Sequence, residues 1–105
     1  MDMETADREL VGSYARDGSE NAFRTLVARH VDLVFGAALR QTGDPGMAEE
    51  ITQNVFIALA RKAPRLASHE TLAGWLHRTA ILEAKARLRA ELRRQRREHV
   101  AAALD

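Results

Sequence analysis

The side chains that could do chemistry do not combine into a catalytic pattern. Glu49 and Glu50 are adjacent, and adjacent residues of a helix do not face each other, so they do not form an acid–base pair. The sequence has no Gly-rich phosphate loop, His-Glu-x-x-His motif, EF-hand or nucleophile elbow. The histidines lack the spacing of metal ligands, and we expect each to be a surface or half-buried polar residue: His30, His69, His77 and His99. The sequence therefore predicts a binding protein and not an enzyme, with no metal and no cofactor.

The charged residues are divided unevenly along the chain. Residues 1–50 carry ten acidic residues against five arginines, whereas residues 51–105 carry eleven lysines and arginines against five acidic residues. This asymmetry favours a polyanionic partner for the second half and a different partner for the first. Ordinary surface charge on helices explains the same pattern, and the charge count alone does not separate the two interpretations.

Composition indicates one small helical domain inside the cell. The 105 residues are 46% hydrophobic but only 5% aromatic, and no cysteine is present for a disulfide or a thiolate site. The acidic start, Met-Asp-Met-Glu, does not resemble a signal peptide, and no apolar run approaches the roughly 20 residues of a membrane span. We therefore expect a cytoplasmic protein that does not bind membranes.

Apolar spacing and helix-end signals predict three to four helices packed as a compact all-α bundle. We expect the first helix to begin at an Asp7 cap and to end at Asp17-Gly18, and the second to run from a Ser19 cap to Thr42-Gly43. The third would start at Asp44-Pro45 and end before Pro64. Residues 64–71 would form a loop before a fourth helix that starts near residue 71 or 72 and, beyond about residue 90, frays or projects into solvent.

Three runs of this sequence resemble region 2 of the sigma-70 family of bacterial RNA polymerase sigma factors, in its extracytoplasmic-function (group 4) branch. They are Asp-Arg-Glu-Leu-Val over 7–11, Thr-Gly-Asp-Pro-x-x-Ala-Glu-Glu-Ile-Thr-Gln-x-Val-Phe over 42–56, and Leu-x-x-Trp-Leu-x-Arg-Thr-Ala over 72–80. The resemblance spans about residues 7–98. It implies an N-terminal tail over 1–6, a region 2 helical domain over 7–92, and over 93–105 the start of a basic linker toward a region 4 that this chain lacks.

The resemblance implies that the third helix binds RNA polymerase. In the family this surface grips the helical coiled coil of the polymerase β′ clamp, and the matching residues here are Glu49, Glu50, Gln53 and Asn54. Glu50 and Gln53 are three residues apart, so a carboxylate and an amide lie side by side on the helix. Without the resemblance, an ordinary solvated face near the start of a helix accounts for the same residues.

The fourth helix and the loop before it would hold promoter DNA. The resemblance implies recognition and melting of the −10 element, with a pocket formed by residues 67–71 for a base flipped out of the non-template strand and a basic surface for its phosphates. Trp75 is either a stacking platform or, by its helical phase with Leu72 and Leu76, partly core. The candidate DNA-binding residues are Lys62, Arg65, Ser68, His69, Thr71, Trp75, Arg78, Lys85, Arg87 and Arg89.

Two departures from the family pattern keep other functions open. First, many members have Asn and Asp where this chain has Leu82 and Ala86, so a promoter preference does not transfer. Second, sigma factors of this branch add a linker and a helix-turn-helix domain after region 2, so we expect either an excised domain or a protein that works with a partner carrying the other half. A protein of this family would lie on the nucleoid when it is bound to polymerase.

Two alternative functions remain open. The first alternative is a sigma-like module that binds polymerase or an anti-sigma factor without recognising a promoter, and the second is a general DNA-binding protein that uses only its Arg-rich end.

Overall fold

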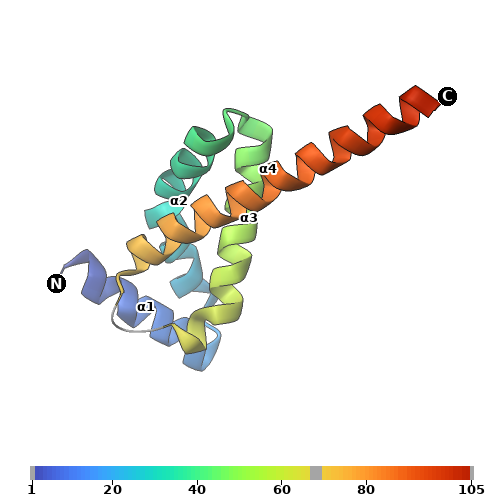
Figure 1. Cartoon of the computed structure of the whole chain (residues 1–105). Helices are drawn as coiled ribbons and strands as arrows, with labels where there is room; N and C mark the ends of the chain where they lie inside the picture. Colours follow the sequence, from blue (N-terminus) through green and yellow to red (C-terminus); the bar gives the residue numbers. More distant parts are fainter. Residues whose placement is uncertain (1, 67–69, 105) are drawn as a thin grey trace.

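The computed structural model describes residues 2–66 and 70–104, which form an all-α bundle. Within this part of the chain there are four α-helices, α1 (Met3–Asp17), α2 (Glu20–Thr42), α3 (Pro45–Lys62) and α4 (Leu72–Leu104), and one short 3-10 helix, η1 (Ala63–Arg65). Figure 1 shows α2 and α3 side by side, α1 at one end and α4 crossing the bundle. The all-α fold predicted from the sequence is confirmed.

Capping residues set the end of α1, both ends of α2 and the start of α3. Gly18 ends α1 and Gly43 ends α2, with φ angles of 64° and 65° in the left-handed region that glycine adopts without strain. Ser19 caps α2 by accepting a hydrogen bond from the backbone N–H of Ala22, and Asp44 caps α3 by accepting from two backbone N–H groups of its first turn. Pro45 occupies the first position of α3, where no N–H is needed. These predicted boundaries are confirmed.

The predicted start of the first helix is wrong. Helix α1 begins at Met3 and is capped by Asp2, whose carboxylate accepts a hydrogen bond from the backbone N–H of Thr5 at 2.8 Å. Residues 3–6, expected to be a tail, are therefore helical. Asp7 lies in the second turn of α1 and is no cap. Both aspartates fit the capping pattern in the sequence, and only the packing of α1 against α2 decides which of them is the cap.

Asp7 has a buried partner on α2 instead. His30 Nε2 lies 2.8 Å from Asp7 Oδ2, and Arg29 Nη1 donates to Asp7 Oδ1 at 3.4 Å. Asp7 is 2% exposed and His30 4% exposed, so the expectation of a surface or half-buried histidine is wrong for His30. The sequence places these residues 23 positions apart and carries no local signal of their contact.

Small residues let α2, α3 and α4 approach closely around the core. Alanines stand at the contacts, all at most 2% exposed: Ala37, Ala38, Ala48, Ala80 and Ala84. Larger aliphatic side chains fill the space between them: Leu26, Val34, Ile51, Val55, Leu59 and Leu76. Because an alanine contributes little beyond its Cβ, such contacts bring helix axes close together and fix the rotation of each helix about its own axis.

Helix α4 continues well beyond this core. Every described residue from Leu92 to Leu104 is exposed, and Figure 1 shows this red half of the helix extending alone from the bundle. The described chain accordingly measures 61 × 24 × 24 Å. Of the two outcomes expected for this end of the helix, projection into solvent is the one observed.

The Asp7–His30 contact predicts a stability effect. Replacing Asp7 with Ala leaves the buried imidazole without its partner, and we expect the free energy of unfolding to fall by about 3 kcal/mol. Chemical denaturation followed by circular dichroism measures this change. Glu9→Ala is the matched control, since Glu9 is exposed on the same helix and should change stability by less than about 0.5 kcal/mol. Equal effects of the two variants would contradict the assigned role of Asp7.

Candidate functional site

The outer face of α3 carries all four residues predicted to bind polymerase. Glu49, Glu50, Gln53 and Asn54 are each exposed, while residues at the intervening positions face the core. Gln53 and Asn54 follow Glu50 by three and four residues, so all three share one side of the helix. The structure therefore brings these side chains together on one solvent-facing surface.

Sequence reasoning missed one residue of this face. Ile57 follows Gln53 by four residues and Asn54 by three, and it is 49% exposed. Ile57 thus adds exposed apolar area one helical turn beyond the two amides, and apolar area beside polar groups is usual in protein interfaces. The available signal was that Ile57 is out of phase with Ile51, Val55 and Leu59, all of which are buried.

The predicted DNA-binding cations of α4 lie on two different sides of the helix. Arg78, Lys85 and Arg89 recur at intervals of seven and four residues, and all three are exposed. Arg87 is two residues from Lys85 and from Arg89, which places it about 200° around the helix from either. The spacing in the sequence could have separated Arg87 from this set.

Arg87 contacts carboxylates instead of open solvent. Its Nε donates to Glu50 Oε2 of α3 at 3.2 Å, and its Nη1 donates to Glu91 Oε2 at 3.3 Å. Its side chain is 34% exposed. Arg87 therefore links the predicted polymerase-binding face of α3 to α4, a contact between two predicted sites that the sequence did not indicate.

Two candidates near the start of α4 also have partners within the chain. The Thr71 hydroxyl accepts a hydrogen bond from the backbone N–H of Gly74 at 3.0 Å and so caps α4. Arg78 forms a two-point ion pair with Glu70, in which its Nη2 donates to Glu70 Oε1 at 3.0 Å. Phosphate binding by Arg78 would have to displace Glu70.

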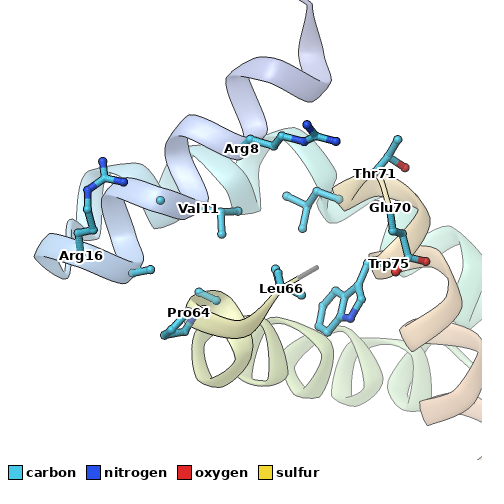
Figure 2. A pocket seen from close by; sticks show the side chains of 12 residues that line it. Arg8, Val11, Arg16, Pro64, Leu66, Glu70, Thr71 and Trp75 are labelled. Carbon is cyan, nitrogen blue, oxygen red and sulfur yellow. The ribbon is translucent and has the colours of Figure 1, made fainter. Parts of the chain in front are cut away.

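A cavity of about 330 Å³ lies between α1, η1 and the start of α4. Figure 2 shows Leu66 and Trp75 on one side of it, Val11 of α1 facing them, and Arg8 and Arg16 along α1. Trp75 is half-buried and packs against the core, which agrees with the interpretation that it is partly core. The cavity brings Thr71 and Trp75 together with α1, which sequence reasoning did not connect to the site.

The remaining candidate DNA-binding residues are exposed or lie outside the described residues. Lys62 and Arg65 are exposed at the end of α3 and in η1, while Ser68 and His69 fall outside the described residues. Among the residues described, no three His, Cys, Asp or Glu side chains gather as a metal site requires. Nor does any helix in residues 2–66 and 70–104 have the length and apolar character needed to cross a membrane.

Comparison with known proteins decides the family. The sequence profile described as Sigma-70 region 2 matches residues 26–98, which hold every candidate site residue. The chain belongs to the sigma-70 family, as a region 2 domain. A curated relative, RNA polymerase sigma factor CarQ from Myxococcus xanthus, is 32% identical over 74 residues, which are 70% of this chain and 42% of that protein. No solved structure matches the chain.

The first departure from the family pattern, at Leu82 and Ala86, lies on the surface of the structure. Leu82 is 58% exposed and Ala86 is exposed, both on the solvent side of α4 beside Arg78, Lys85 and Arg89. Neither residue supports the core. Leu82 and Ala86 therefore add apolar surface beside the exposed cations of this sigma-70 domain.

The ion pairs of Glu91 predict a measurable titration. The hydrogen bond from Arg94, with a smaller contribution from the hydrogen bond of Arg87, lowers the pKa of Glu91 to about 2, and desolvation of the carboxylate opposes part of this shift. Because this pKa is below its ordinary value of 4.5, the contribution of Glu91 to stability is present above pH 4.5 and is lost as the pH falls through about 2. NMR titration of the carboxyl carbon should show that midpoint.

Two variants check the cause of this shift. Arg94→Gln removes the hydrogen bond that lowers the pKa of Glu91 most, and the titration midpoint should rise toward 4.5. Arg93→Gln removes a neighbouring charge for which the described residues hold no carboxylate within ion-pair distance, and it should leave the midpoint near 2. A titration of Glu91 close to 4.5 in the unaltered protein would show that the ion pairs do not form in solution.

Proposed function

We propose that this domain acts in transcription initiation as part of a sigma factor of the extracytoplasmic-function type. It binds core RNA polymerase through the outer face of α3, and it recognises and melts the promoter −10 element by holding the non-template strand against α4. It acts by binding and not by catalysis. The observation that carries the proposal is that α3 and α4 each expose one side of the helix on the outside of a shared core. Two separate exposed sides are what binding two partners at once would require.

The chemistry of the α3 face supports polymerase as its partner. Glu50 supplies an exposed carboxylate, and Gln53 and Asn54 supply amides that both donate and accept hydrogen bonds. Ile57 supplies apolar area beside them. Such a face suits a basic helical partner like the β′ clamp coiled coil that family members bind, and its charge speeds and orients docking.

Polymerase binding predicts the effect of a charge change on this face. Gln53→Arg places a cation where a basic partner would dock, and we expect the affinity for core polymerase to fall at least about tenfold. Fluorescence anisotropy of the labelled domain titrated with core polymerase measures it. Gln41→Arg, an identical change at an exposed position of α2, should leave affinity within about twofold. If both variants bind like the unaltered domain, the α3 face is not the docking surface.

The surface around α4 supports strand binding by two features. Lys85 and Arg89 are exposed on one side of α4 and can contact successive phosphates. Thr71, which lines the cavity together with Trp75, belongs to the run 67–71 that resembles the family's base pocket, and the cavity volume of about 330 Å³ suits one extruded base. Arg87 is left out of this surface, because it faces Glu50 and Glu91.

Strand binding predicts a change in salt dependence. The double variant Lys85→Gln/Arg89→Gln removes two phosphate contacts, so the slope of log affinity against log salt for a −10 non-template oligonucleotide should become shallower by about 1.4. The binding is measured by anisotropy in the presence of core polymerase. Arg24→Gln/Arg40→Gln removes the same charge from α2 and should retain the original slope. Equal slopes for both double variants would reject α4 as the phosphate-binding helix.

One observation favours a second candidate function. Leu82 is 58% exposed within the proposed strand-binding surface, and an exposed apolar residue at that point suits a protein contact such as one with an anti-sigma factor. Under this alternative the domain binds polymerase or a regulator without holding DNA. The oligonucleotide separates the two functions, because only the first predicts salt-dependent binding of the −10 strand by the polymerase complex.

A further inference from the structure

A chain of alternating charges runs from the outer face of α3 onto α4. Arg87 of α4 donates from Nε to Glu50 Oε2 of α3 at 3.2 Å and from Nη1 to Glu91 Oε2 at 3.3 Å. Arg94 pairs with Glu91 and also with Glu98, which lies one turn further along α4. We call these five residues the charge chain. Glu50 is its only member on α3, and therefore the only one that belongs to the predicted polymerase-binding face.

Arg87 can leave Glu50 without losing every partner. It uses a different nitrogen for each carboxylate, so its hydrogen bond with Glu91 does not depend on the one with Glu50. The Glu91 side chain is 18% exposed, whereas the Glu50 side chain is 62% exposed. An ion pair weakens as water surrounds its groups, because water screens the charges. We therefore expect Glu91 to hold Arg87 more firmly than Glu50 does.

The balance of charge within the charge chain favours an external cation at Glu50. The charge chain contains the carboxylates of Glu50, Glu91 and Glu98 but only two guanidinium groups, so one negative charge is not neutralised. If a partner binds Glu50, the members on α4 that remain are two carboxylates and two guanidinium groups, which neutralise one another. Release of Arg87 from Glu50 therefore leaves a balanced set of ion pairs on α4.

We propose that Arg87 is an internal competitor for Glu50, which a cation of the docking partner displaces onto Glu91. This proposal rests on the proposed function, because it takes the α3 face as the docking surface. Arg87 contacts only Oε2 of Glu50, and no described residue bonds Oε1, so an incoming cation can approach that oxygen. The two cations then repel each other, and the repulsion moves Arg87 toward Glu91. A partner without a cation at this point leaves Arg87 in place, so the contact disfavours neutral and acidic partners.

Removal of the competitor should strengthen docking. The affinity of the whole labelled chain for core polymerase is measured by fluorescence anisotropy, and Arg87→Gln should raise it about three- to fivefold, as expected for the loss of one exposed ion pair. Arg93→Gln is the matched control, because it makes the same charge change on α4 and the described residues hold no carboxylate within ion-pair distance of Arg93. It should change the affinity by less than about 1.5-fold, since water and salt screen a charge this far from Glu50.

A double-mutant cycle shows whether the gain passes through Glu50. In the Glu50→Gln background Arg87 has no carboxylate of α3 to neutralise, so Arg87→Gln should change the affinity by less than about 1.5-fold. A full three- to fivefold gain in that background would overturn the proposal, because the gain would then come from repulsion between Arg87 and polymerase itself. Arg87→Gln also removes the pair with Glu91, so circular dichroism at 222 nm verifies that each variant keeps its helix content.

The variant Gln53→Arg separates failure of this proposal from failure of the proposed function. If Gln53→Arg weakens binding while Arg87→Gln leaves the affinity unchanged or lowers it, the α3 face docks polymerase but Arg87 does not compete, and only this proposal is overturned. If Gln53→Arg has no effect, the α3 face is not the docking surface and both proposals fail. A gain for Arg87→Gln that Arg93→Gln lacks, and that disappears in the Glu50→Gln background, supports Arg87 as the competitor.

Discussion

The close packing of α4 against α2 and α3 through alanines is the constraint on which the other features depend. Ala80 and Ala84 are fully buried on α4, and they meet a core in which Ala37, Ala38 and Ala48 are also buried. Larger side chains at these contacts would push the helices apart. With the rotation of α4 fixed in this way, Arg78, Lys85 and Arg89 point to solvent, whereas Arg87 turns toward α3. The same packing leaves one face of α3 uncovered.

The two outward faces are separate surfaces that meet at one ion pair. Glu50 belongs to the proposed polymerase-binding face and Arg87 belongs to α4, and the 3.2 Å contact between them lies at the edge of both. The Glu50 side chain is 62% exposed, so it stays accessible to a partner while Arg87 holds it. A partner that takes Glu50 away from Arg87 also removes one contact that orients α4. The geometry thus gives polymerase docking a physical connection to the helix proposed to hold DNA.

Much of this could be predicted from the sequence, and the rest has identifiable physical reasons. Helix ends with local signals, such as Gly18, Gly43 and Asp44-Pro45, agree with the structure because capping is a short-range interaction. The start of α1 was wrong because two aspartates fit the cap and only the contact with His30 chooses between them.

At the candidate site, the sequence predicted exposed residues on α3 correctly but grouped Arg87 with the other cations of α4. Composition identifies a basic segment, whereas only helical phase and the position of Glu50 show which cations are paired. Ile57 was missed for a related reason. Its exposure depends on which side of α3 the bundle covers, and the sequence shows that only through the phase of its neighbours.

The absence of cysteine from the natural sequence permits a direct test of the central claim that α3 and α4 offer two separate faces. Single cysteines at exposed positions, Asn54→Cys on α3 and Arg89→Cys on α4, can be labelled with a maleimide and the rate followed for the chain alone, with core polymerase, and with polymerase plus the −10 strand. The account predicts that polymerase slows labelling at position 54 only, and that adding the strand then slows labelling at position 89. Labelling at position 54 that polymerase leaves unchanged, or protection of position 89 by polymerase alone, would contradict it.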